Sequence, residues 1–214
     1  MSGGIWKWIY LGFCIDTLVM RPTAEELDIL NDQNFLKLKN SLSEKIIQYL
    51  AKIERSLAEE IKEMPFKFPE GTFLKAGKIS KGEQYQGLPY FILDYPRLFT
   101  QKEVFAFRAM LWWGHHFSCT LHLQGDYLQQ NKSRIINNIF TQNALYFCVN
   151  DQPWDYHYQQ NNYQQISALT KETVNQHIKE KGFLKISDYL PVTDWSEYES
   201  FALKSFARFL NYLQ

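Results

Sequence analysis

The sequence predicts an α+β fold, in which an antiparallel sheet of about four to five strands has one face covered by a long N-terminal helix and C-terminal helices. Two patterns predict this class. Apolar residues first recur every three or four positions, as in an amphipathic helix, and after Pro69 they alternate with polar residues, as in half-buried strands. With 214 residues, 45% hydrophobic and 21% charged, the chain has the composition of an ordinary globular protein.

The first predicted element is a single long helix from Asp32 to Met64, where leucines and isoleucines are spaced by three and four with Lys and Glu between them. Pro65 ends it, because proline lacks the backbone N–H that continues a helix. The apolar stripe of this helix fits two roles. It can lie across the sheet of its own chain, which is the commoner arrangement, or form the seam of a helix-mediated oligomer.

Four segments then alternate in the manner of strands and predict an antiparallel meander: Phe73–Lys81, Leu88–Tyr95, Val104–Trp113 and His115–Gln124. The first two are separated by 82–87, which predicts a hairpin with a longer loop, and Gly114 is the hinge between the last two. Glu83 and Tyr85 in the hairpin loop fit a binding edge, although turns of this kind are commoner without a function.

The second half of the chain alternates helices with short strands. Three helices are predicted: from Asp126 as N-cap to about Phe140, from Thr170 to a glycine cap at Gly182, and from a capping-box-like Asp194–Glu197 to the C-terminus. Short strands are predicted at 144–149 and at Phe183–Ile186. Between them, 150–165 is polar, rich in amides and punctuated by aromatic residues, which predicts a surface loop.

The segment Ile5–Met20 is the most apolar stretch of the chain. It is shorter than the roughly 20 apolar residues of a membrane-spanning helix and contains Lys7 and Asp16, so no span is predicted. We expect residues 1–20 to be an apolar appendage, docked or poorly ordered, before a single α+β domain at 21–214. An alternative is that the protein starts at Met20.

Composition also indicates the compartment and the partners. The three cysteines, Cys14, Cys119 and Cys148, form no CxxC pair, which favours free thiols and a cytoplasmic location. The 23 basic and 23 acidic residues balance, so nucleic acid and anionic membranes, which attract surplus positive charge, are not expected as partners. A small molecule or a protein partner remains, and the oligomeric state is not determined.

Three stretches have a layout that resembles a known group. They are the helix leading into Pro65, the strands that flank GEQYQGLPYFILDY, and GFLKISDYLPVTDW before the last helix. Their order resembles that of the YktB-like group of uncharacterised bacterial α+β proteins. The resemblance implies a bacterial α+β protein, and it implies no activity or catalytic residue.

The common catalytic signatures do not occur in the sequence. A phosphate-binding GxxxxGK[ST], a dinucleotide-binding GxGxxG, a nucleophile elbow and a zinc-protease HExxH are all missing, so no cofactor is expected. His116 and His122 fall on one face of a predicted strand, but six residues separate them by about 20 Å. Two ligands of one zinc must each lie about 2 Å from the metal, so no metal site is expected either.

The strongest candidate site is one face of the predicted sheet, because alternation gathers polar and aromatic side chains there. The candidate ligand-binding residues are Tyr90, Asp94, Arg108, Trp112, His116 and His122, with Ser118 and Thr120 beside them. Hydroxyls, imidazoles, a cation and a carboxylate between aromatic walls are typical of a small-molecule pocket. The alternative is a half-solvated sheet whose open face is polar because it meets water.

Two functions follow from this face. The first is a non-catalytic domain that binds a small ligand or a protein partner. The alternative is a hydrolase-like enzyme in which His116 or His122 is the general base and 150–165 is a lid. Asp155 and His157 would form an acid–base pair only if this loop folded over the sheet. An enzyme needs an acid and a base that converge on one cleft, whereas a binding surface does not.

Overall fold

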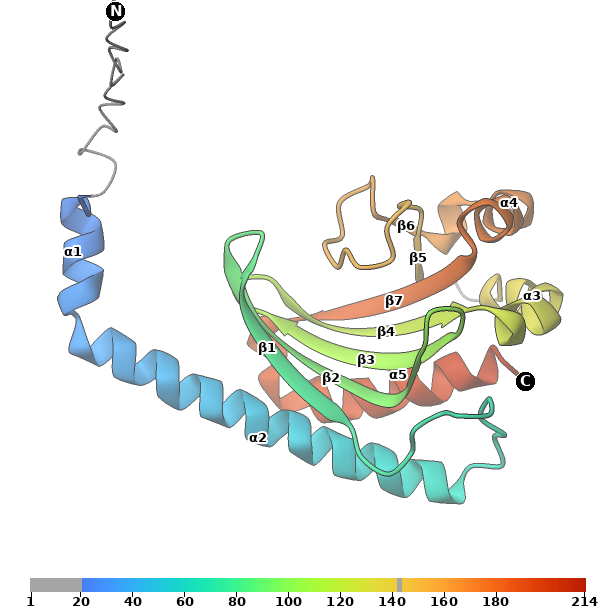
Figure 1. Ribbon diagram of the computed structural model, residues 1–214, viewed down its shortest axis with the longest axis horizontal. Coiled ribbons are helices and arrows are strands. Elements are labelled where there is room, and N and C mark those ends of the chain that lie inside the picture. The colour runs from blue at the N-terminus through green and yellow to red at the C-terminus, as the bar shows by residue number, and fades with distance from the viewer. Residues whose placement is uncertain (1–20, 142–143) are drawn as a thin grey trace, which may run out of the picture. The chain divides into compact units, whose positions relative to one another are not determined.

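The computed structural model describes residues 21–141 and 144–214 and confirms the α+β class. Its sheet has seven strands, in the order β1-β2-β3-β4-β7-β5-β6, and every neighbouring pair is antiparallel (Figure 1). The count exceeds the predicted four to five strands. Ile5–Met20 and Cys14 lie outside the described residues, so the predicted appendage stays a prediction.

The chain divides into two compact units, with the boundary between Glu44 and Lys45. The described part of the first unit consists of α1 (Ala24–Asn31) and the start of α2 (Gln33–Glu63). The side chain of Thr23 accepts a hydrogen bond from Glu26 N, and the Glu26 carboxylate accepts one from Thr23 N, so a capping box begins α1. None of the side chains of α1 is buried.

The second unit begins within α2, and the predicted long helix is confirmed to within about a residue at each end. Here the apolar stripe is used as expected for a helix that lies across a sheet, because Ile46, Leu50, Ile53 and Leu57 are buried in the main core. No described helix is long and apolar enough to cross a membrane.

The meander of the first four strands is confirmed, although the first strand begins at Lys78 and not at Phe73, which forms only an isolated bridge with Arg97. The remaining strands extend the sheet. The strands are β1 (Lys78–Tyr85), β2 (Leu88–Phe99), β3 (Val104–Trp112), β4 (His116–Gln124), β5 (Tyr146–Cys148), β6 (Tyr163–Gln165) and β7 (Phe183–Pro191). β7 is longer than the predicted Phe183–Ile186 because it pairs along the whole of β4 and continues to Pro191.

One face of the sheet is apolar and forms the main core. Alternation puts Phe91, Leu93, Phe107 and Leu121 on this face, and α2 and α5 (Tyr198–Asn211) cover it (Figure 1). The predicted cover by a long N-terminal helix and a C-terminal helix is therefore confirmed. α3 (Asp126–Ile139) and α4 (Lys171–Lys181) contribute further apolar residues to the same core.

The hairpin between β1 and β2 differs from the prediction. Its turn consists only of Gln86 and Gly87, which have φ angles of 50° and 79°, and two left-handed residues make the tight turn that suits twisted strands. The segment Gly82–Tyr85 therefore continues β1 and is not loop. The pairing of β1 with β2 shifts between Gly82 and Tyr85, as it does at a β-bulge.

Two of the predicted helix starts are also wrong. Gly125, with φ 88°, occupies the cap position of α3, and Asp126 is the first helical residue. The predicted capping box at Asp194 does not form, because Val192–Glu197 is a short 3₁₀ helix before α5. By contrast, the caps at Thr170 and Gly182 are confirmed, and Gly182 has the left-handed φ of 79°.

Candidate functional site

The opposite face of the sheet, which we call the polar face, brings the six candidate residues together on one side. In the strand register Asp94, Arg108, Thr120 and Ser187 stand in one row across β2, β3, β4 and β7. Tyr90, Trp112 and His116 form a second row, and Ala106, His122 and Lys185 form a third. Successive strands thus present these side chains to a common space.

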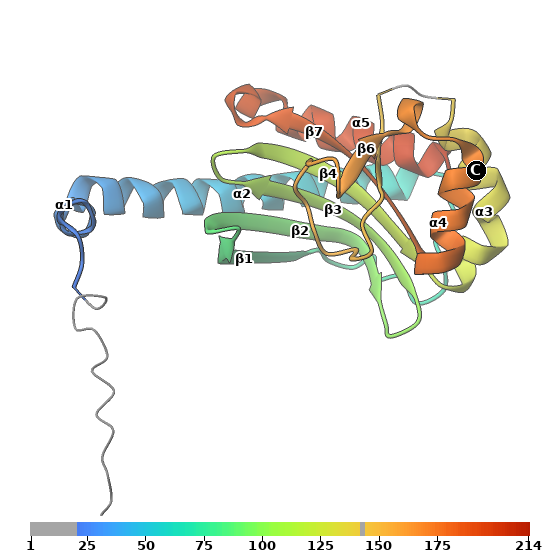
Figure 2. The same cartoon turned by 90° about the horizontal axis from the view of Figure 1, so that it is seen from above.

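The polar face is covered, which corrects the prediction of a surface loop at 150–165. The segment 150–162, which we call the covering loop, lies over the sheet (Figure 2), and its last residues lead into β6. Tyr156, His157 and Asn162 are buried, whereas Trp154 is 50% exposed. The alternation of aromatic residues at 154, 156 and 158 was the signal in the sequence for a segment that packs on something.

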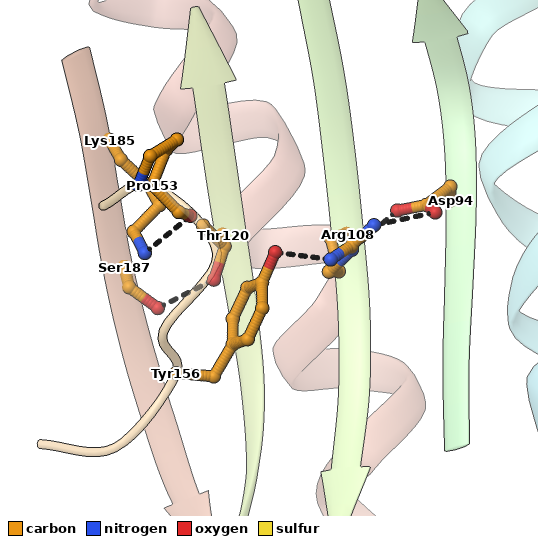
Figure 3. A network of polar contacts seen from close by, with 7 residues as sticks. All are labelled: Asp94, Arg108, Thr120, Pro153, Tyr156, Lys185 and Ser187. Carbon is orange, nitrogen blue, oxygen red and sulfur yellow. Dashed lines mark hydrogen bonds and ion pairs between the residues drawn. The ribbon is translucent and has the colours of Figure 1, made fainter. Parts of the chain in front are cut away.

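Arg108 is the centre of the contacts on the polar face (Figure 3). Its Nε and Nη2 donate to the two carboxylate oxygens of Asp94 at 2.6 and 2.8 Å, and its Nη1 donates to the hydroxyl of Tyr156. Burial opposes the charge of the guanidinium, but Tyr156 and Asp94 outweigh it and raise the pKa of Arg108. A bidentate pair of this kind fixes both position and orientation.

Lys185, which the sequence analysis missed, anchors the covering loop. Its side chain is fully buried, and its Nζ donates to the backbone oxygen of Pro153 at 2.8 Å (Figure 3). It also donates to the backbone oxygen of Asp155 at 2.5 Å. The same nitrogen lies 4.8 Å from the ring centre of Tyr156 and 4.9 Å from that of Tyr163. Burial lowers the pKa of Lys185 to about 8. The period-two alternation of β7 was the only signal that this lysine faces inward.

Hydroxyl groups link the sheet to the covering loop beside Lys185. The Ser187 Oγ lies 2.8 Å from the Thr120 Oγ1 and 2.5 Å from the hydroxyl of Tyr158, and it donates to the oxygen of Cys119 at 3.0 Å. Burial raises the pKa of Tyr158. These hydroxyls are therefore neutral at ordinary pH, and they serve as structural contacts of the loop.

The histidines do not form an acid–base pair. Burial lowers the pKa of His116 to about 4 and that of His122 to about 3, with Lys185 and Arg108 adding to the effect on His122. The Nε2 atoms of both are buried and lack a hydrogen-bond partner among the described residues. Within the same described part of the chain, no hydrogen bond or ion pair joins Asp155 to His157.

A cleft of about 210 Å³ opens on the polar face at the edge of the covering loop. We call it the Arg108 cleft, and its lining consists of Tyr85, Tyr90, Ile92, Arg108, Met110, Trp154 and Tyr156. Of the six candidate residues, only Tyr90 and Arg108 line it. Asp94 holds Arg108 in place, Trp112 packs against Tyr85 with ring centres 4.9 Å apart, and His116 and His122 lie elsewhere on the polar face.

Tyr85 reaches the cleft because of the irregular hairpin. The extra residue in β1 places Tyr85 opposite Leu88, which is on the same face as Tyr90. Gly82 is needed beside them, because a Cβ at this position would lie 2.5 Å from the ring of Tyr90. The bulge, which alternation cannot predict, thus adds an aromatic wall to the site.

A second hollow, of about 570 Å³, lies between α4 and β5. Most of its lining side chains, such as Glu172, Gln176 and Glu180, are exposed and come from α4 alone. Its charged groups do not converge, so it is the weaker candidate. Across 21–141 and 144–214, no group of three or more His, Cys, Asp or Glu side chains is placed to hold a metal ion.

Comparison with known proteins identifies no relative: no family model, curated protein or solved structure matches the chain. The resemblance to the YktB-like group therefore stays a prediction. The chemistry of the site rests on its own geometry.

Proposed function

We propose that the protein is a non-catalytic domain that binds a small ligand in the Arg108 cleft. The observation that carries this proposal is the cleft itself, in which side chains from three strands and the covering loop converge on a fixed guanidinium. Few, well-placed polar groups between apolar and aromatic walls are the usual make-up of a ligand pocket.

The geometry favours a small ligand over a protein partner at this face. The covering loop occupies much of the polar face, and its residues Tyr156 and His157 are bound through their backbone N–H groups to the hydroxyl of Tyr85, at 2.6 and 3.2 Å. The open part has a volume of about 210 Å³. This is below the usual pocket for a drug-sized molecule, about 300–1,000 Å³, so a compact ligand fits best.

The alternative of a hydrolase gains no support from the histidines. A general base works best when its pKa lies near the working pH, whereas His116 and His122 have pKa values of about 4 and 3. Neither lines the cleft. Binding without turnover is the function that fits this arrangement.

The proposal is tested by ligand-observed NMR with a set of single-ring fragments. The binding of each fragment is compared among the unchanged protein, Trp154→Ala and Phe35→Ala. Trp154→Ala removes a half-exposed wall of the cleft without touching the Asp94–Arg108 pair, and Phe35→Ala removes an exposed ring of α2 as the matched control. Loss of an aromatic contact worth about 0.5–1.5 kcal/mol weakens binding about two- to tenfold. We expect this loss for Trp154→Ala only.

Three outcomes would contradict the proposal. If no fragment binds, or if Trp154→Ala and Phe35→Ala bind every fragment as the unchanged protein does, the cleft is not a ligand site. New product signals that appear during the measurement would instead support the enzyme. Arg108 is not used for this test, because removing one member of a buried ion pair costs about 3–5 kcal/mol of stability.

A further inference from the structure

The hydrogen bonds that the Tyr85 hydroxyl already makes define what it can offer to a ligand. Its oxygen accepts two backbone hydrogen bonds, from Tyr156 N at 2.6 Å and from His157 N at 3.2 Å. A phenol has one proton to donate and two lone pairs to accept with. Both lone pairs are in use, so the hydroxyl can only donate, and no acceptor for its proton is found among the described residues.

Arg108 also has donors to spare. A guanidinium carries five N–H protons, and three hydrogen bonds from Arg108 go to Asp94 and Tyr156. Two protons remain. The hydroxyl of Tyr156 accepts one of these bonds and keeps its own proton. The polar groups of the cleft therefore offer donors to a ligand and few acceptors.

The charge of Arg108 in the cleft is already balanced within the protein, and this decides how much charge a ligand must carry. Asp94 neutralises Arg108 through two hydrogen bonds, so a ligand need not carry a full negative charge to be bound. An oxygen acceptor is sufficient, and both a neutral carbonyl and a carboxylate supply one.

The walls and the volume define the remainder of the ligand. Aromatic rings surround the space, with the ring centre of Tyr85 at 6.1 Å from that of Tyr90 and 6.3 Å from that of Tyr156, both edge to face. A cavity of about 150 Å³ holds a benzene molecule. The cleft, at about 210 Å³, therefore has room for one ring with one short substituent.

We propose that the ligand of the Arg108 cleft is a single-ring aromatic molecule with an oxygen acceptor, a carbonyl or a carboxylate, that faces Arg108 and the hydroxyl of Tyr85. This inference rests on the proposed binding function and adds the chemical class. The ring packs against the aromatic walls of the cleft, and the acceptor takes the protons that the protein itself leaves unused.

Four probes test the class by ligand-observed NMR on the full chain. Acetophenone has a ring and a neutral carbonyl, benzoate has a ring and a carboxylate, toluene has a ring alone, and benzylamine has a ring and a cationic donor. One or two hydrogen bonds to an otherwise unused donor are worth about a tenfold gain in affinity. We expect acetophenone and benzoate to bind about tenfold more tightly than toluene, and benzylamine to bind no better than toluene.

The variant Tyr85→Phe keeps the ring and removes the donor. We expect it to reduce the preference for acetophenone over toluene by about three- to tenfold. The ratio is measured because a loosened covering loop would weaken both probes alike, whereas the lost hydrogen bond weakens only acetophenone. Tyr127→Phe is the matched control, since Tyr127 packs against Phe105 with ring centres 5.5 Å apart and does not line the cleft.

The outcomes separate this inference from the proposed function. Equal affinity for toluene, benzylamine and acetophenone would overturn the acceptor class, and so would an unchanged ratio in Tyr85→Phe, while the cleft would remain a binding site. If none of the four binds but other fragments bind in a manner sensitive to Trp154→Ala, the class is again wrong. If no fragment of any kind binds, the proposed function itself fails.

Discussion

His116 and His122 stay uncharged in the folded protein at neutral pH, because burial lowers their pKa values to about 4 and about 3. Lys185 and Arg108 lower the pKa of His122 further, and the neighbouring His115 adds to the lowering at His116. A proton on either ring is therefore disfavoured in the folded state. In the unfolded chain the same rings take up a proton near pH 6.5.

We predict that the free energy of unfolding falls as the pH is lowered from about 6.5 toward 4. In this range the unfolded chain binds protons at His116, His122 and His177, whose pKa burial likewise lowers to about 4, and the folded chain does not, so acid favours unfolding. Each histidine contributes a slope of about 1.4 kcal/mol per pH unit. Urea unfolding at about pH 7 and about pH 5 measures this change in the free energy of unfolding. The slope of His122→Gln should be smaller by one histidine than that of the unchanged protein, and equal slopes in the two proteins would contradict the prediction.

At the scale of elements, the covering loop is the part of the site that depends most on distant residues. Its backbone oxygens at Pro153 and Asp155 accept from Lys185 of β7, and its backbone N–H groups at Tyr156 and His157 donate to Tyr85 of β1. Two strands that are far apart in the sheet order thus hold one loop. This arrangement satisfies buried backbone groups that water would otherwise have to reach.

We predict that Lys185→Met loosens the covering loop. The substitution leaves the oxygens of Pro153 and Asp155 without their donor, and an unsatisfied buried acceptor costs about 1–3 kcal/mol. Amide hydrogen exchange at Tyr156 and His157 should become faster, and the free energy of unfolding should fall by about 2 kcal/mol.

Lys62→Met is the matched control for this experiment, because Lys62 is an exposed lysine that pairs with Glu59 on the surface of α2. Exposed ion pairs are worth about 0–1 kcal/mol, so this variant should leave exchange in the loop unchanged. If amide exchange at Tyr156 and His157 is as slow in the Lys185→Met protein as in the unchanged protein, Lys185 does not anchor the loop.

At the scale of the whole molecule, burial is concentrated in the second compact unit. No described side chain from 21 to 44 is buried, and the buried residues of α2 begin at Ile46. Leu30 and Leu38 are 65% and 69% exposed. The main core therefore forms from residues after the boundary between Glu44 and Lys45.

We predict that Leu38→Ala keeps the stability of the full chain. Leu38 lies in α2 and is 69% exposed, and alanine is at least as good a helix former as leucine. Surface changes usually alter stability by about 0.5 kcal/mol or less, so the free energies of unfolding in urea should agree within about 1 kcal/mol. A loss of several kcal/mol would contradict this prediction.

Much of the site could be predicted in outline and little of it in detail. Alternation along β2, β3 and β4 correctly put Tyr90, Asp94 and Arg108 on one face, because the side-chain period of a strand is local and does not depend on partners. It could not show that Asp94 and Arg108 form a pair, since this depends on the register between two strands. Nor could it show Tyr85 at the cleft, because a bulge changes the face.

The sequence by itself determined the α+β class, the long helix, the first four strands and the polar face, all of which follow from hydrophobic period and proline or glycine signals. Only the tertiary structure decided that the segment 150–162 covers this face and that Lys185 holds it. Tyr156 bonds to Tyr85, 71 residues away, and Lys185 bonds to Asp155, 30 residues away. Contacts between residues so far apart in the sequence depend on packing and on the pairing of buried polar groups, which a local sequence pattern does not predict.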